Sequence, residues 1–379
     1  MPSIPSGGSH NPLDLPKSYV SGLARGATGD ENFEVQVWQC EPVQGGFGSA
    51  VGGTALYRLR VRSCADRRCS LILKVLYARP DESEASPYYW KREFELYRSD
   101  ILADMPRDSF VAPRMYALEA HDDACWIWME DIEDDKGEWA LEDFADVAER
   151  VGRFNGAWLA NAPLPTGPWL SRGWHAAIVP ALADCFNQLN RLLEHPLARL
   201  TLPLEAKAEI DSIWRDRRIF MEALRGLPQT FCHYDAFRRN VLFRGDDAVL
   251  LDWALAGVGA IGEDLVSLVA VSLYYEGYTQ EYAAQLDDVV FASYIKGLRQ
   301  TGWAGDQRLA RIGYTCGMTL RGLAGVKQDI DQLTHDAAAV DLPQVHRVSD
   351  LEQIARFFAD IRRFRLLKMA REARSLLTN

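Results

Sequence analysis

The sequence lacks the segments that mark secreted and membrane proteins. Its first twenty residues contain no apolar core, so we expect no signal peptide. The longest apolar run, Leu265 to Tyr275, ends at Glu276 and falls well short of the ~20 residues that a membrane-spanning helix needs. The seven cysteines are scattered and odd in number, which favours reduced thiols and a cytoplasmic location. Cys64 and Cys69, the only close pair, have no nearby histidine and fit a hairpin turn better than a metal site.

Motifs of several common enzyme classes are also missing. The chain has no Walker G-K-[ST] element, no H-E-x-x-H, no G-x-S-x-G and no internal repeat. A formal net charge of −11 argues against nucleic acid as the main partner and is compatible with a cationic substrate. With 379 residues, of which 48% are hydrophobic and 25% charged, the composition is that of a globular protein with two or three subdomains.

The most informative stretch runs from Phe231 to Trp253. Two apolar runs bracket a polar loop that carries His233, Asp235 and Asn240, and the next apolar run ends in Asp252, seventeen residues after Asp235. Phosphoryl transfer needs a carboxylate to accept the proton of the attacking hydroxyl, and oxygen ligands for the magnesium that neutralises the phosphates. This order of residues supplies both from one compact unit, whereas an ordinary hairpin would not require it.

This string resembles the aminoglycoside phosphotransferase and choline kinase-like family, whose members are relatives of the protein kinases. Asp252 stands where protein kinases have the Asp of Asp-Phe-Gly, while Trp253 replaces the Phe and Ala254 the Gly. The likeness spans roughly residues 34 to 275. It implies an α+β, bilobal protein kinase-like fold, with a small antiparallel β-sheet lobe that carries one helix and a larger, mostly helical lobe.

The resemblance also implies a role for each polar residue of this stretch. Asp235 would be the catalytic base, and Asn240 and Asp252 would hold Mg²⁺. Asp264 would brace the catalytic loop from below. His233, two residues before the base, would anchor the loop rather than act as an acid or base.

Two predicted strands and a glycine-rich joint precede this unit. Apolar and polar residues alternate from Phe33 to Trp38, and apolar residues alternate with arginines from Tyr57 to Arg62. Glycines in the joint would let backbone N–H groups approach a polyphosphate. By the resemblance, the joint would cover the nucleotide's phosphates with Gly45, Gly46, Gly48 and Ser49. Residues 1–32, ahead of the strands, have the composition of a loose arm.

A lysine lies inside the next apolar run, Ser70 to Tyr77. Because a buried lysine is unfavourable without a partner, Lys74 calls for a carboxylate. The segment from Tyr89 to Tyr97 is helical in composition and offers Glu93, with Glu95 as the alternative. The resemblance assigns Lys74 to the α- and β-phosphates of a nucleotide, with Glu93 as its anchor.

We expect two further strands, Phe110 to Arg114 and Cys125 to Met129, to complete the small lobe. Glu130 to Ile132 then resembles the kinase hinge, whose backbone would pair with the adenine edge while Met129 lines the ring. These expectations divide the chain into an arm (1–32), a nucleotide-binding lobe (33–132) and a catalytic and substrate-binding helical lobe (133–379).

Helices are expected throughout the second lobe. Apolar residues recur at three- and four-residue steps in its first helix, at Phe144, Val147, Val151, Phe154 and Trp158. Further helices are predicted from Ala177 to Leu193, from Leu204 to Leu224, and in the chain after Asp264. The last helix would begin with a capping box, Ser349 to Glu352.

Together these assignments predict a small-molecule kinase that uses ATP (or GTP) and Mg²⁺ to phosphorylate a hydroxyl of a small substrate, with amino sugars, aminoglycosides and amino alcohols among the candidates. The alternative is a catalytically inactive, kinase-like nucleotide-binding or scaffold protein. Arg238 and Arg239 either reach the transferred phosphate or hold the loop. Acids that could bind substrate amines are Glu276, Glu281, Asp287, Asp288, Asp329, Asp331 and Asp336. Aromatic residues that could cage a quaternary amine are Tyr274, Tyr275, Tyr278 and Trp303.

Overall fold

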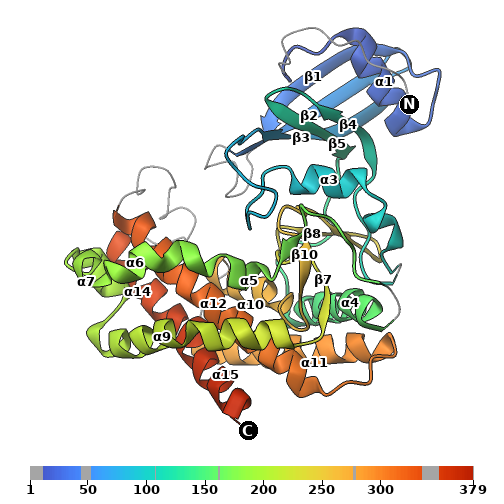
Figure 1. The fold of residues 1–379 in the computed structure, drawn as a ribbon. Helices are drawn as coiled ribbons and strands as arrows, with labels where there is room; N and C mark the ends of the chain where they lie inside the picture. Colours follow the sequence, from blue (N-terminus) through green and yellow to red (C-terminus); the bar gives the residue numbers. More distant parts are fainter. Residues whose placement is uncertain are drawn as a thin grey trace.

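The computed structural model describes residues 12–43, 53–106, 108–160, 163–275, 279–334 and 350–378, which form two lobes (Figure 1). The smaller lobe holds a five-stranded antiparallel sheet in the order β1-β2-β3-β5-β4. Its strands are β1 (Val35–Val43), β2 (Thr54–Ser63), β3 (Arg68–Tyr77), β4 (Met115–Ala120) and β5 (Ala124–Glu130). The predicted bilobal α+β architecture is therefore confirmed.

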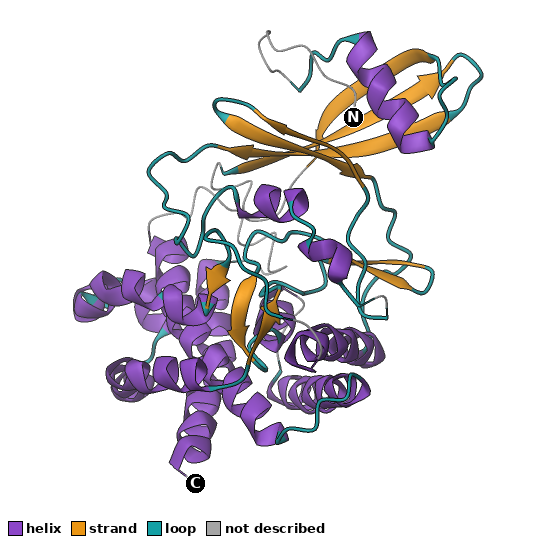
Figure 2. Cartoon of the chain, turned by 45° about the vertical axis from the view of Figure 1, so that its right-hand side comes forward, coloured by secondary structure: helices purple, strands orange, loops and turns teal. Residues whose placement is uncertain are grey.

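Each face of this sheet is covered by one helix. Helix α1 (Lys17–Thr28) lies on one face of the sheet (Figure 2), where Val20, Leu23 and Ala24 pack into the core. The expectation of a loose arm is therefore wrong for this segment, because its apolar residues follow the helical spacing that buries one side of a helix. Helix α3 (Arg92–Arg98) covers the opposite face and lies between the sheet and the larger lobe (Figure 1).

The strand alternation of β3 positions the buried lysine. Ile72 and Leu76 pack on the α3 side of the sheet, and Lys74 shares their side because strand residues alternate between faces. Lys74 is paired with Leu56 of β2 and with Ile127 of β5, so it lies in the middle of the sheet.

Two predicted elements of this lobe are displaced. Helix α3 begins at Arg92 rather than Tyr89. In the preceding turn, backbone N–H groups bind side chains instead of helical carbonyls; the Trp90 N–H, for example, donates to the Glu82 carboxylate (3.0 Å). The predicted strand from Phe110 to Arg114 is wrong, and the strand lies at Met115–Ala120. Val111 bridges to Val249 of the larger lobe.

The larger lobe surrounds two small sheets with helices. One sheet has the order β6-β10-β7, formed by Ser171–Arg172, Gly257–Ala260 and Gln229–Cys232. The other is the hairpin of β8 (Val241–Arg244) and β9 (Asp247–Leu250), which separates Asn240 from Asp252. The hairpin predicted from the apolar runs is thus present.

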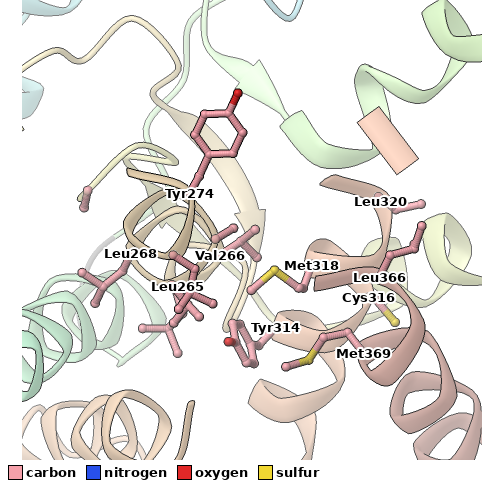
Figure 3. Packing of buried hydrophobic residues seen from close by; sticks show 14 of the residues in the cluster. Leu265, Val266, Leu268, Tyr274, Tyr314, Cys316, Met318, Leu320, Leu366 and Met369 are labelled. Atoms are coloured by element: carbon pink, nitrogen blue, oxygen red, sulfur yellow. The ribbon is translucent and has the colours of Figure 1, made fainter. Parts of the chain in front are cut away.

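Long helices build the rest of this lobe: α4 (Leu141–Ala160), α9 (Leu204–Gly226), α10 (Leu265–Tyr275), α11 (Gln280–Gln300), α12 (Gln307–Thr334), α14 (Leu351–Arg362) and α15 (Met369–Thr378). A π-helical turn, η3 (Arg363–Lys368), joins the last two. Figure 3 shows side chains of α10 meeting those of α12 and of the C-terminal helices in the core. No helix in the described part of the chain has the length and hydropathy needed to cross a membrane.

Two helical predictions need correction. The segment from Ala177 to Leu193 forms short helical turns rather than one helix, with Pro180 in the first of them, where its ring and missing N–H prevent a continuous helix. Those turns, with their neighbours, are α5 (Trp174–Ala177), η2 (Val179–Leu182), α6 (Ala183–Asn187), α7 (Leu189–Leu192) and α8 (Pro196–Thr201). Helix α14 is capped by Asp350, which accepts from the Gln353 N–H (2.8 Å); Ser349 lies outside the described residues.

Candidate active site

The loop between β7 and β8 brings Asp235 and Asn240 together and places them beside the chain segment that carries Asp252. Asn240 donates its side-chain N–H groups to the Asp235 Oδ2 (2.9 Å) and to the Asp235 carbonyl (2.9 Å). Its backbone carbonyl accepts from the Leu251 N–H (2.8 Å), the residue before Asp252. The amide of Asn240 therefore fixes the Asp235 carboxylate and leaves its own Oδ1 as an acceptor.

Asp264 supports this loop from the protein interior. Its carboxylate accepts from the backbone N–H groups of His233 (3.1 Å) and Tyr234 (2.5 Å) and from the Asn155 side chain (3.1 Å). Tyr234 has a φ of 68°, a left-handed conformation that costs free energy and is held here by these contacts. Burial raises the pKa of Asp264 to about 6, although the hydrogen bonds lower it.

His233 anchors the loop as a neutral imidazole. Its Nδ1 accepts from the Asp235 N–H (3.1 Å), so its Nε2 carries the proton and donates to the Leu251 carbonyl (3.0 Å). Burial lowers the pKa of His233 to about 4, which keeps the ring uncharged near neutral pH. With both nitrogens engaged by backbone, the ring has no free atom for proton transfer to a substrate.

Lys74 bridges the two lobes. Its Nζ lies 2.5 Å from the Glu93 Oε2 and 2.8 Å from the Asp252 Oδ1. Burial lowers the pKa of Lys74, but the charges of Asp252 and Glu93 outweigh it and raise the pKa above the ordinary value. Glu95, the alternative anchor, pairs instead with Lys91 (3.2 Å). Lys74 thus contacts Glu93 rather than Glu95, and Asp252 beside them.

Asp235 is an unusually basic carboxylate. Burial raises its pKa to about 7, the positive charge of Arg321 opposes this, and the negative charge of Asp252 adds to it. A general base works best when its pKa lies near the working pH. The environment of Asp235 therefore suits proton abstraction near neutral pH.

A buried arginine, Arg92, is a feature that sequence reasoning missed. It is fully buried and donates to four backbone carbonyls, those of Ser86, Pro87, Trp169 and Ala254, at 2.6–3.0 Å. It thereby fastens α3 to the segment that follows Asp252 and to a loop of the larger lobe. Its only sequence signal is its position directly before Glu93.

The central part of the chain matches a known enzyme family. Residues 65–300 fit the sequence model of the phosphotransferase enzyme family. The chain belongs to this family. A comparison with curated protein sequences finds no match. The resemblance on which the site assignments rest is therefore confirmed at the level of the family.

Solved structures of kinases and phosphotransferases share this fold. Amicoumacin kinase hAmiN in complex with AMP-PNP, Ca²⁺ and Ami has 16% identity and a TM-score of 0.51, covering 81% of this chain and 85% of that one. A choline kinase from Cryptosporidium parvum Iowa II has 10% identity and a TM-score of 0.55, covering 96% and 97%. An aminoglycoside phosphotransferase from Alicyclobacillus acidocaldarius has 14% identity and a TM-score of 0.55, covering 97% and 99%. At these identities the likeness shows the fold.

The phosphotransferase has a donor set that fits a phosphate-bound magnesium ion. Asn240 keeps its Oδ1 available, and the Oδ2 of Asp252 is not used by Lys74. The described residues contain no group of three or more His, Cys, Asp or Glu that could hold a metal by themselves. Mg²⁺ is often held by one or two protein oxygens together with substrate phosphates, so this sparse set is appropriate.

The structure alters the part of the hinge prediction that concerns Glu130. Met129 is buried on the α3 side of the sheet, but the Glu130 N–H already donates to the Arg114 carbonyl (3.0 Å) and cannot also serve adenine. The Glu130 carboxylate binds Arg244 (2.9 Å). Ile132 is half-buried. The glycine-rich joint with Gly45, Gly46, Gly48 and Ser49 lies outside the described residues.

The two loop arginines of the phosphotransferase have different surroundings. Arg238 donates to the Asp134 carboxylate (2.7 Å) and to the carbonyls of Lys136 and Gly137 (2.7 Å each), so it holds the turn between the lobes. Arg239 is exposed, and its guanidinium lies 4.1 Å from the centre of the Tyr275 ring. Only Arg239 is therefore available to a ligand.

Three of the five described acids that were considered for substrate binding have internal partners. Asp287 binds Arg311 (2.9 Å), and Asp329 binds Arg362 (2.5 Å). Asp331 pairs with Lys327. Glu281 and Asp288 are exposed on α11, whereas Glu276, Tyr278 and Asp336 lie outside the described residues.

The aromatic residues considered for substrate binding also differ in their surroundings. Tyr274 is buried and donates to Gln332 (2.7 Å). Trp303 follows the far end of α11, a helix of 21 residues that spans about 30 Å at the usual rise, and is covered by Arg299. Of the described candidates, Tyr275 is the one that touches the catalytic loop, through Phe237.

Proposed function

We propose that the protein transfers the γ-phosphoryl group of ATP (or GTP) to a hydroxyl of a small molecule, with Mg²⁺ as cofactor. One observation carries the proposal: Lys74 contacts both Glu93 and Asp252 while Asn240 fixes the carboxylate of Asp235. Family membership supports phosphoryl transfer. The structurally similar proteins, a kinase in complex with AMP-PNP and Ca²⁺, a choline kinase and an aminoglycoside phosphotransferase, support a nucleotide, a divalent cation and a small acceptor.

Asp235 would orient the acceptor hydroxyl and take its proton as the oxygen attacks the γ-phosphorus. Its raised pKa makes the carboxylate basic enough to hold that proton, and Asn240 keeps it in place. Lys74, held by Glu93, would bind the α- and β-phosphates. Mg²⁺, when bound through Asn240 and Asp252, supplies charge neutralisation on the phosphates.

The remaining assignments concern the nucleotide's other contacts. Met129 would line the adenine and the backbone of Ile132 would reach its edge, while the glycine-rich joint would cover the phosphates. Residues 33–132 would then act as the nucleotide-binding lobe and residues 133–379 as the catalytic and acceptor-binding lobe. A cytoplasmic location remains a prediction from the sequence.

The test combines turnover with nucleotide binding. ADP release is measured over a panel of hydroxylated amines, sugars and acids, for the wild type and for Asp235→Asn. We expect the variant to bind Mg·ATP by calorimetry with nearly unchanged affinity and to turn over ~10²–10⁴-fold more slowly. Asp122→Asn, in the exposed turn between β4 and β5, is the matched control and should behave as wild type.

Two results would contradict the proposal. If the wild type binds nucleotide but phosphorylates nothing in a broad panel and does not hydrolyse ATP, the protein is a nucleotide-binding scaffold. If Asp235→Asn loses nucleotide affinity as severely as Asp252→Ala, the roles of base and metal ligand have been exchanged.

A further inference from the structure

Two arginines near the candidate base have no acidic partner among the residues that the structure describes. Arg321 projects from α12, is half-buried, and its guanidinium lies 5.2 Å from the centre of the Trp174 ring. Arg239 covers the face of Tyr275 at 4.1 Å. Within the described ranges of the chain, neither arginine forms a hydrogen bond or an ion pair with a carboxylate. Neither guanidinium is therefore held in an ion pair with another described residue.

Elements from both lobes converge on Arg321. Its charge is the largest influence opposing the effect of burial on the pKa of Asp235, and it also lowers the pKa values of Tyr88 and Tyr275, which burial raises. Tyr88 packs edge-on against Trp174, with ring centres 5.7 Å apart. Arg321 thus lies among the loop before α3, the catalytic loop and the end of α10.

We infer that the acceptor is an anion, a hydroxy compound carrying a carboxylate or phosphate group, and that Arg321, with Arg239, binds this group while Asp235 receives the hydroxyl. The inference rests on the proposed function and adds its substrate class. A guanidinium presents paired N–H donors that match a carboxylate or phosphate in geometry and charge. The half-exposed ring of Tyr88 would contact an apolar or aromatic body on the same molecule.

The same arrangement disfavours cationic acceptors. An amine placed beside Asp235 would meet the charges of Arg321 and Arg239 in a partly desolvated site, where repulsion is stronger than in water. A quaternary amine would need a free aromatic face. Among the described rings of this site, Tyr275 is covered by Arg239 and Trp174 by Arg321, which leaves Tyr88 by itself rather than a cage of several rings.

The reaction itself is unchanged by this assignment. The bond between the γ-phosphorus and the bridging oxygen of ADP breaks, the bond from the acceptor oxygen to that phosphorus forms, and the hydroxyl proton passes to Asp235. The anionic group of the acceptor takes no part in these steps. Arg321 and Arg239 are therefore specificity residues rather than catalytic ones.

A matched set of probes tests the charge preference directly. 4-(Hydroxymethyl)benzoate, its methyl ester and 4-(hydroxymethyl)benzylamine share one ring and one primary alcohol but differ in charge, and hydroxy acids and phosphate monoesters of other shapes extend the acidic arm. Kanamycin and choline serve as cationic probes. We expect kcat/KM, from ADP release, to be highest for an acidic probe and at least tenfold above its neutral or cationic counterpart.

Substitution of Arg321 then tests whether this residue recognises the charge of the acceptor. Arg321→Gln should raise the KM for the acidic acceptor about tenfold to a hundredfold, which corresponds to the loss of one charge-assisted hydrogen bond. It should also reduce the difference in kcat/KM between the acid and its methyl ester. Arg321→Lys should recover part of the loss. Arg356→Gln, on an exposed arginine of α14 whose carboxylate partner Glu352 is 3.7 Å away, is the matched control and should leave the KM unaltered.

The outcomes separate this inference from the proposed function. The inference is overturned if a cationic or neutral acceptor outperforms every acidic probe, or if no acidic probe is turned over. It is also overturned if the Arg321→Gln variant retains the preference for acidic acceptors. The proposed function fails separately, when Mg·ATP does not bind or when Asp235→Asn does not slow hydrolysis of ATP by water.

Discussion

Replacing Asp235 by Asn should stabilise the ligand-free protein at neutral and alkaline pH. Burial raises the pKa of this carboxylate from 3.8 to about 7, against the opposing charge of Arg321. Each pKa unit corresponds to about 1.4 kcal/mol, so the ionised carboxylate costs the fold up to about 4 kcal/mol. Asn has nearly the same shape and keeps an oxygen to accept the hydrogen bond from Asn240.

The direction of the effect follows from proton binding. Between pH 3.8 and about 7, the folded protein holds the Asp235 proton and the unfolded chain does not, so this group's contribution to the free energy of unfolding falls as pH rises. Below this window the contribution is fully present, and above it the contribution is lost. The variant has no such proton, so its advantage over the wild type should grow from pH 5 to pH 8 by about 2–3 kcal/mol.

Urea unfolding at both pH values, without nucleotide or Mg²⁺, measures this difference. Comparing the variant with the wild type at each pH cancels the titration of all other groups to first order. Asp122→Asn is the control and should show no pH-dependent advantage. If the gap between wild type and Asp235→Asn is the same at pH 5 and pH 8, the carboxylate is not the basic group described here, and its role as a base at neutral pH loses its physical support.

Three further substitutions probe the site and its frame. Asp252→Ala should weaken Mg·ATP affinity and single-turnover rate together, measured by calorimetry and rapid quench, because it removes a metal ligand. Arg92→Met should cost about 3 kcal/mol or more in urea unfolding, since it leaves buried carbonyls without a donor, and unchanged stability would show that water replaces the guanidinium. Gly259→Ala places a Cβ against the Tyr234 hydroxyl and should cost about 1–3 kcal/mol, whereas Gly22→Ala in α1 meets no neighbouring atom and should not destabilise.

The catalytic unit was predictable because its chemistry is local in the sequence. Asp235 and Asn240 are five residues apart on one loop, and the β8–β9 hairpin returns the chain to Asp252. Lys74 was also predictable, since a lysine in an apolar strand requires a partner. Its partner could be narrowed only to Glu93 or Glu95, because the choice depends on where a seven-residue helix begins.

Other features depend on contacts between distant segments and leave little trace in the sequence. Arg92 binds carbonyls of Trp169 and Ala254, 77 and 162 residues away. The strand predicted at Phe110 to Arg114 failed for a related reason, as Val111 hydrogen-bonds across the lobe boundary to Ala248 and Leu250. Alternation patterns describe one strand at a time and do not reveal which lobe the strand joins.

The net charge of the chain does not predict the charge around the acceptor site. A net charge of −11, with many acids in the helical lobe, is compatible with a cationic substrate. In the structure, however, Asp287 and Asp329 neutralise arginines within the protein, so they contribute no net field to a ligand. Arg321 retains its charge because no described carboxylate reaches it. Screening beyond about 10 Å makes the nearest charges decisive for a small acceptor, and beside the carboxylates of Asp235 and Asp252 these include the guanidinium of Arg321.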